Sequence, residues 1–209
     1  MAKVFTQDMA KRMVAHQIKT SYNSGYQVFM IPEGFTTIGK SAFENMYTDN
    51  VIFPASLEVI EDNAFKNCCL REVRFPEQVR YIGNSAFEDC AYLYNVEFEY
   101  DLIEYIGDRA FYNCISLPDP DSIYNIEIPR SVKYIGRDAF ARSEHFDEDE
   151  HLDLTILSNP DIRIDNCYSH EPIGLSAYAT KPTAEHVAEL NVISANEQYG
   201  GDRYVFTGY

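Results

Sequence analysis

The sequence predicts an α+β repeat solenoid, a right-handed stack of about five to six coils with a parallel sheet on one face. Three observations support this fold: one phrase recurs five times, each copy begins with alternating apolar residues, and both ends depart from the phrase and carry a helical pattern. A single coil cannot close a core, so the copies are expected to stack. The predicted parts are an N-terminal capping helix within 1–24, repeats within 25–157, and a C-terminal cap and tail within 158–209.

The recurring phrase is built around an alanine followed by a phenylalanine, which returns at intervals of 22 to 29 residues. Fixed apolar positions predict columns of buried side chains along the stack. The fourth copy has one extra residue near Glu99–Tyr100 and a longer link around Pro118–Ser122, which both fit loop bulges. The anchors are Phe43, Phe65, Phe87, Phe111 and Phe140, and five residues before them lie Ile38, Ile60, Ile82, Ile106 and Ile135.

Each copy begins with a short run in which apolar and polar residues alternate. A period of two indicates a strand that buries one face. One such strand in every copy predicts a parallel sheet along the stack. The apolar positions are Tyr26/Phe29/Ile31, Val51/Phe53, Leu70/Val73/Phe75, Leu93/Val96/Phe98 and Ile123/Ile126/Ile128.

Together these residues form the phrase Ile-Pro-x-x-Val-x-x-Ile-Gly-x-x-Ala-Phe-x-x-Cys, which resembles the BspA-like leucine-rich repeat family over residues 26–157. The resemblance implies a leucine-rich-repeat-like stack and a role as an adhesin or interaction protein, often on a cell surface. Two copies depart from the pattern. Glu61 replaces the glycine of the other copies, and the Glu99–Tyr100 stretch lacks the proline, so both residues help the turn without being indispensable.

The N-terminal end predicts a helix from Gln7 to Ser21, with Thr6 as its N-cap and a stripe of apolar residues at helical spacing. Two roles are open for this helix. It either covers the apolar end of the first coil or binds a partner through its apolar stripe. Repeat stacks need atypical terminal elements, which favours the first role.

After Ser143 the phrase fades. Strands are expected at Leu152–Leu157 and near Ile173–Tyr178, followed by a helix at Pro182–Leu190. That helix resembles the alanine-rich closing helix of the same family and is the predicted C-terminal cap. The tail from Ser194 to Tyr209 is either an edge strand or mobile.

The composition excludes several partners. The chain has 17 Lys and Arg against 33 Asp and Glu, a net charge of −16, which opposes binding to nucleic acid and to anionic membranes. No apolar run is long enough to span a bilayer, so no membrane insertion is expected. Charged residues interrupt the first 20 positions, so no secretory signal is predicted there. We expect a cytoplasmic protein, with the cell surface or a virion as the alternative if a signal was removed or export is non-classical.

The cysteines follow the repeat. Cys68, Cys90 and Cys114 occupy one position of the phrase, which Met46 and Ser143 fill in the outer copies. Because methionine and serine cannot pair as disulfides, a column of buried free thiols is predicted rather than a disulfide or metal framework.

Few residues point to chemistry. The run from His145 to His151 holds four carboxylates and is interpreted as a solvated acidic loop; the alternative, a divalent cation site, lacks the glycine of a calcium loop. No phosphate-binding glycine loop and no local nucleophile–base pair occur. The sequence therefore predicts no enzyme, no cofactor and no metal.

The outward positions of the strands carry the candidate site. Parallel strands lie about 4.8 Å apart, so equivalent residues form rows along the sheet. The rows change from apolar at the first coils to acidic at the last, and the apolar end needs a cover, either the N-terminal helix or a partner. The outer row is Met30, Ile52, Arg74, Glu97, Glu127 and Thr155, and the flanking row is Val28, Asn50, Glu72, Asn95, Asn125 and Asp153.

The leading functional hypothesis is a non-catalytic protein–protein interaction module that binds through the concave sheet of the solenoid. Its acidic end favours a basic protein partner. One alternative is an acidic intracellular inhibitor or decoy that occupies a basic groove of a nucleic-acid-handling protein. Another is a structural subunit of a larger surface or virion assembly. The capped ends predict a monomer or a weak oligomer.

Overall fold

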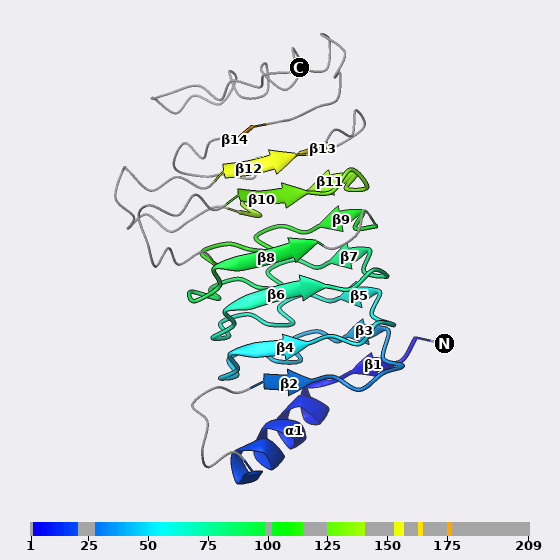
Figure 1. The fold of residues 1–209 in the computed structure, drawn as a ribbon, viewed down its shortest axis with the longest axis vertical. Coiled ribbons are helices and arrows are strands. Elements are labelled where there is room, and N and C mark those ends of the chain that lie inside the picture. Colours follow the sequence, from blue (N-terminus) through cyan, green and yellow to red (C-terminus); the bar gives the residue numbers. More distant parts are fainter. Residues whose placement is uncertain are drawn as a thin grey trace.

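The computed structural model describes residues 2–20, 28–98, 102–114, 125–140, 153–156, 163–164 and 175–176. In these ranges the chain winds into stacked coils, with the N-terminus at one end of the stack (Figure 1). Every strand pair within these ranges is parallel, which confirms a parallel-sheet solenoid. The coils are numbered 1 to 5 by their anchors Phe43, Phe65, Phe87, Phe111 and Phe140.

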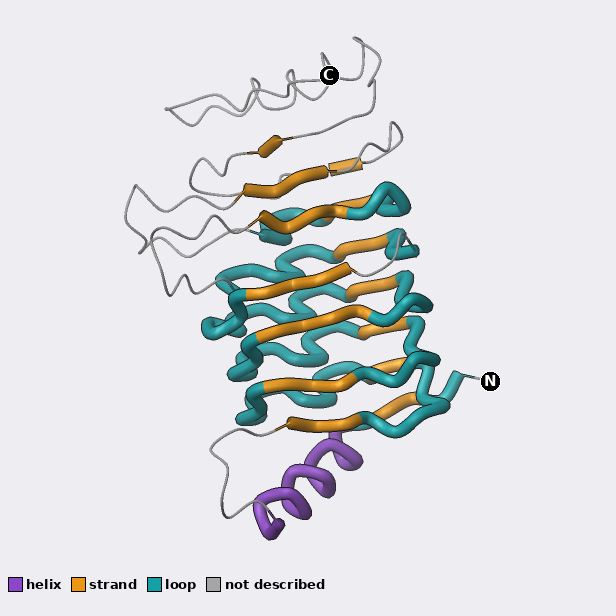
Figure 2. Tube along the Cα trace, in the orientation of Figure 1, coloured by secondary structure: helices purple, strands orange, loops and turns teal. Residues whose placement is uncertain are grey.

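The predicted strands form one face of the stack, the long-strand sheet (Figure 2). The inward residues Phe29, Val51 and Val73 are buried. Their neighbours along each strand point outward, as the alternation predicts. The sheet has two sections, ordered β2-β4-β6-β8 and β10-β12-β14. Its strands are β2 (Val28–Met30), β4 (Asn50–Ile52), β6 (Glu72–Phe75), β8 (Asn95–Phe98), β10 (Asn125–Ile128), β12 (Asp153–Ile156) and β14 (Leu175–Ser176).

A second parallel sheet, the short-strand sheet, covers another face, which the sequence did not predict. The isoleucine column was predicted as buried but not as strand, because a two-residue strand is too short to show a period of two. The sheet runs without a break in the order β1-β3-β5-β7-β9-β11-β13. Its strands are β1 (Val4–Phe5), β3 (Thr37–Ile38), β5 (Val59–Ile60), β7 (Tyr81–Ile82), β9 (Tyr105–Ile106), β11 (Tyr134–Ile135) and β13 (Arg163–Ile164).

The remaining face, the turn face, carries the anchors. Backbone hydrogen bonds join neighbouring coils here, as from Phe65 N–H to the Ala86 carbonyl at 2.7 Å. Residues two before each anchor, and two after each of the first four, have positive φ, which small polar residues tolerate best. The positions before are Ser41, Asn63, Ser85, Arg109 and Asp138, and those after are Asn45, Asn67, Asp89 and Asn113.

The anchor phenylalanines form the core column, as the sequence predicts. All five are buried, and successive rings stack with centroids 4.9, 5.2, 5.2 and 5.3 Å apart. Phe5 of β1 stacks on Phe43 at 5.4 Å and lengthens the column by one ring. The common depth of these rings establishes that the copies lie in one register.

The glycine of the phrase makes room for the coil before it. A Cβ at Gly83 would lie 2.7 Å from the backbone nitrogen of Asp62, whose carboxylate accepts the N–H of Asn84 at 2.9 Å. In coil 1 the residue equivalent to Asp62 is Lys40, which has no carboxylate. In coil 2 the glycine is replaced by Glu61, whose carboxylate accepts a hydrogen bond from the Lys40 backbone N–H at 2.7 Å. This exchange explains the departure of coil 2 from the phrase. The glycine arrangement recurs with Asn84 below Gly107 and Asp108 below Gly136.

Helix α1 (Gln7–Thr20) is the predicted N-terminal helix and lies at the β2 end of the stack (Figure 1). Ala10 on this helix is fully buried, and Met13 packs against the core. Other expectations lie outside the described residues: the bulges at Glu99–Tyr100 and Pro118–Ser122, the acidic loop His145–His151, the helix Pro182–Leu190 and the tail Ser194–Tyr209.

Candidate functional site

The strand register assembles the outer row on the first four coils. Met30 lies beside Ile52, and Arg74 lies beside Glu97. The flanking row is assembled in the same way, with Val28 beside Asn50 and Glu72 beside Asn95. These rows lie on the exterior of the long-strand sheet, and rigid strands hold them in place.

Three apolar side chains at the first coils are exposed. Val28 is 41% exposed, Met30 63% and Ile52 48%, and together they form the apolar patch. Helix α1 lies at the end of the stack and leaves these side chains accessible to solvent, so the alternative that it covers them was wrong. Contiguous apolar side chains on a sheet are typical of interaction surfaces.

The acidic residues of the rows on coils 3 and 4 are paired within the protein. Arg74 Nε lies 2.9 Å from Glu97 Oε2, and Asn95 donates a hydrogen bond to Glu97 at 2.8 Å. The Tyr94 hydroxyl donates to Glu72 at 2.7 Å. The negative charge of Glu97 is therefore offset by Arg74, and this exposed ion pair itself adds little stability.

The sequence suggested rows that continue through one sheet, but the structure divides them between two sections. β8 ends one section and β10 begins the next, so Asn125 and Glu127 lie beyond a break. Their register neighbours are Asp153 and Thr155 on β12, in line with the predicted rows. The break falls in the coil whose link the sequence showed to be longer.

The short-strand face carries a tyrosine column that the sequence analysis missed. Tyr81, Tyr105 and Tyr134 stack with ring centroids 4.7 and 4.8 Å apart. Beside them, Glu104 accepts hydrogen bonds from Lys133 at 2.7 Å and from Arg80 at 3.3 Å. These contacts lower the pKa of Glu104. The signal was the Tyr-Ile-Gly triplet of three copies. The charges and ring faces here are largely satisfied within the protein.

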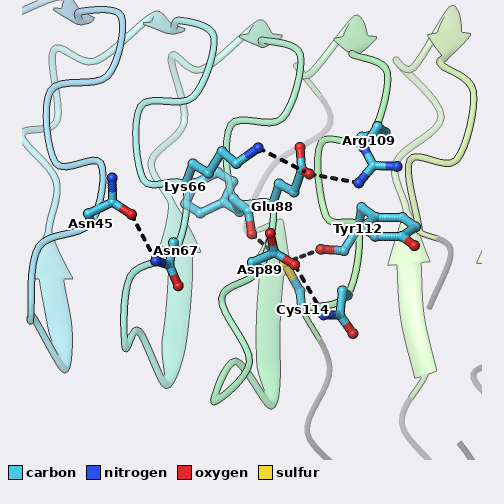
Figure 3. Close-up of polar contacts among 10 residues, drawn as sticks. Asn45, Lys66, Asn67, Glu88, Asp89, Arg109, Tyr112 and Cys114 are labelled. Atoms are coloured by element: carbon cyan, nitrogen blue, oxygen red, sulfur yellow. Dashed lines mark hydrogen bonds and ion pairs between the residues drawn. The ribbon is translucent and has the colours of Figure 1, made fainter. Parts of the chain in front are cut away.

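The turn face holds a buried carboxylate, Glu88 (Figure 3). It lies 2.7 Å from Arg109 and 3.1 Å from Lys66, which come from the coils on either side. Burial raises the pKa of Glu88, but hydrogen bonds from Arg109, Ser85 and Lys66 outweigh burial and lower it overall. Arg109 also lies 3.7 Å from the centroid of the Tyr112 ring. These contacts tie three coils together and are structural.

The predicted column of buried free thiols is confirmed at Cys68, Cys90 and Cys114. The Cys68 and Cys90 thiols donate to carbonyls of the preceding coil, Phe43 at 2.9 Å and Phe65 at 3.1 Å. Burial raises the pKa of both thiols, which keeps them protonated and unreactive. Across the described ranges, His, Cys, Asp and Glu form no group of three that could hold a metal ion. The same ranges contain no helix with the length and apolarity of a membrane span.

The repeat pattern described as the BspA type leucine rich repeat region matches residues 19–147 in six copies. Among solved structures, the chain is similar to the pneumococcal vaccine antigen PcpA, with 20% identity and a TM-score of 0.49 over 77% of this chain and 53% of that one. It is also similar to a leucine rich cell surface protein from Faecalibacterium prausnitzii, with 18% identity and a TM-score of 0.40 over 77% and 61%. The chain thus spans less than two thirds of either structure. No curated protein matches it.

Proposed function

Because the chain belongs to the BspA type leucine-rich repeat family, we propose that it is a non-catalytic protein-interaction module that binds a protein partner through the long-strand sheet. The contact surface consists of the outer and flanking rows, with the apolar patch at the end nearest the first coil. The exposure of Val28, Met30 and Ile52 on adjacent strands carries this proposal. The proposed contact residues are Met30, Ile52, Arg74, Glu97, Glu72 and Asn95, with Glu127 and Asn125 beyond the break.

The patch is suited to binding because it is already ordered. Strands β2 and β4 fix the backbone of all three residues, so little conformational entropy is lost when a partner docks. Apolar side chains that a partner buries fully contribute more affinity than charges that stay exposed. Arg74, next to Ile52 in the outer row, supplies a polar edge.

The pairing of the acidic residues favours an apolar contact over the acidic decoy. A decoy needs carboxylates that are free to meet a basic groove. Glu97 is paired with Arg74, and Glu72 accepts from Tyr94, so a basic partner has to compete with these contacts. The net charge of −16 still opposes an acidic partner, so a neutral or basic protein fits best.

We also propose that α1 is the N-terminal cap of the solenoid. Its residue Ala10 is buried, and the preceding strand β1 places Phe5 against the ring of Phe43. Both contacts cover apolar surface that the first coil would otherwise expose. The cytoplasmic location stays a prediction, with the cell surface as its alternative.

The test compares two charge insertions at exposed apolar sites. The double variant Met30→Lys/Ile52→Lys places two charges in the patch, and Val4→Lys places one at an exposed site, 38% accessible, on the short-strand sheet. Each immobilised protein is incubated with extract from its source cells, and retained proteins are identified by mass spectrometry. We expect a partner that the wild type and Val4→Lys retain and the double variant loses.

Salt concentration separates the apolar contact from the decoy. An apolar contact changes little between low salt and about 0.5 M salt, whereas a charge-led contact weakens steeply over this range. The decoy predicts a different result: Met30→Lys/Ile52→Lys would still retain the partner, whereas salt or a Glu72→Lys/Glu97→Lys variant would remove it. That result would contradict the proposal.

A further inference from the structure

The outward side of the short-strand sheet brings three tyrosines together. Tyr81 on β7, Tyr105 on β9 and Tyr134 on β11 are register neighbours, and these strands follow one another along the stack (Figure 1). Their ring centroids lie 4.7 and 4.8 Å apart, with ring planes 7° and 16° from parallel. The same position holds Thr37 in coil 1 and Val59 in coil 2, so the tyrosine column belongs to coils 3 to 5.

These rings lie on the surface, unlike the rings of the core column. Each tyrosine is half-buried, whereas the isoleucine that follows it in the strand is buried. A tyrosine ring can therefore turn on the surface while the inward residues Ile82 and Ile106 keep the strands in place. Stacking covers the ring faces, so the exposed part of each ring is mainly its edge, where the hydroxyl group and the ortho carbons lie.

A neighbouring carboxylate can take up a phenolic proton. The Tyr134 hydroxyl donates to Asp108 Oδ1 at 3.4 Å. A phenol that loses an electron becomes strongly acidic, so a carboxylate at this position accepts the proton and leaves a neutral phenoxyl radical. Tyr105 stacks directly on Tyr134, so this radical forms in contact with a second phenol ring.

We propose that the tyrosine column is a site of oxidative cross-linking, where Tyr105 forms a dityrosine bond with Tyr81 or Tyr134. The oxidant is hydrogen peroxide acting through a haem peroxidase. Each of the two tyrosines loses one electron and its phenolic proton, and the two radicals join through ring carbons ortho to the hydroxyl groups. The hydrogens on these carbons then move as protons to the two phenolic oxygens. Hydrogen peroxide takes up the two electrons and two protons and becomes two water molecules.

Two features favour coupling within one molecule. Rings held 4.7 and 4.8 Å apart meet at a far higher effective concentration than rings on separate molecules. The net charge of −16 also opposes the approach of a second copy. Because the stacked rings are nearly parallel, one ring has to turn before two ortho carbons can meet, and its place on the surface permits this. The product ties coil 4 covalently to coil 3 or coil 5. This proposal rests on the fold alone and does not depend on the proposed function.

Treatment of the full chain at low concentration with a haem peroxidase and hydrogen peroxide tests the cross-link. The monomer is isolated by size exclusion, and dityrosine is detected by its blue fluorescence. We expect fluorescent monomer that has lost two hydrogens for each bond. Trypsin leaves Tyr81 and Tyr105 together in the peptide 81–109 and Tyr134 in the peptide 134–137. Tandem mass spectrometry therefore distinguishes a bond within the first peptide from a bond that joins the two.

Tyr105→Phe and Tyr92→Phe are matched variants, because each removes one hydroxyl group and keeps the ring. Tyr105 is shared by both possible bonds, whereas Tyr92 is 56% exposed and lies outside the tyrosine column. We expect Tyr105→Phe to lower the dityrosine fluorescence of the monomer at least fivefold, and Tyr92→Phe to lower it by less than a third. Urea unfolding checks that both variants are folded. Equal losses in the two variants, dityrosine in dimers only, or bonds that map to other tyrosines would overturn the proposal.

Discussion

Removing the ring of Phe87 tests the register on which the whole fold depends. Phe87 is fully buried in the middle coil, between Phe65 and Phe111, with both ring centroids at 5.2 Å. Phe75 approaches its edge at 5.7 Å. Phe→Ala substitutions in cores cost about 3–5 kcal/mol. Aromatic pairs add about 0.5–1.5 kcal/mol each beyond burial, so three lost ring contacts place Phe87→Ala at the upper end, about 5 kcal/mol.

Urea unfolding followed by far-UV circular dichroism measures this loss, since the chain has no tryptophan to serve as a fluorescent probe. With a slope of about 2 kcal/mol per molar urea, the midpoint is expected to fall by about 2 M or more. The control is Glu97→Gln, which removes an exposed ion pair and is expected to change stability by less than about 0.5 kcal/mol. Equally small shifts for both variants would mean that Phe87 is not an interior residue and that the register is wrong.

Two further predictions concern contacts between coils. The lowered pKa of Glu88 stabilises the fold above pH 4.5, its ordinary value, and this contribution is lost as the pH falls through the lower folded value. Urea midpoints measured from pH 7 to pH 3 should therefore fall less steeply in Glu88→Gln than in the wild type. At pH 7 the substitution should lower the free energy of unfolding by about 1–3 kcal/mol. Parallel pH profiles for the two proteins would show that Glu88 is not ion-paired. A methyl group at Gly107 would lie 2.5 Å from Asn84 Oδ1 and 2.7 Å from its backbone nitrogen, so Gly107→Ala should cost about 1–3 kcal/mol in thermal or urea unfolding. An unchanged midpoint would mean that the coils are spaced more widely there.

The repeat could be predicted because its signal is redundant. Phe43, Phe65 and Phe87 recur with the same neighbours, so errors at one copy are corrected by the others. The strands of the long-strand sheet were predicted for the same reason, since Val73 and Phe75 alternate with exposed residues in a pattern that other copies share. The outward positions of Met30 and Ile52 follow directly from that alternation.

Features that depend on a single copy or on a very short element could not be predicted. Tyr81–Ile82 is a two-residue strand, and its pairing with Tyr105–Ile106 becomes apparent only when the coils are stacked. The contact of Glu88 with Arg109 joins residues 21 positions apart that have no common place in the phrase. The break between β8 and β10 is a matter of strand pairing, which sequence spacing alone does not specify.

The fit between each glycine and the side chain below it restricts how such a chain can gain or lose coils. The coil that contains Gly107 follows one that offers the side-chain oxygen of Asn84, whereas Glu61 in coil 2 accepts the backbone N–H of Lys40. Copying coil 2 to a place after coil 3 would bring the Glu61 side chain against Asn84, where a Cβ alone is already too close. Coils 3 and 4, which share a glycine followed by a polar residue that accepts the next coil's N–H, are therefore interchangeable at this contact, whereas coil 2 is not.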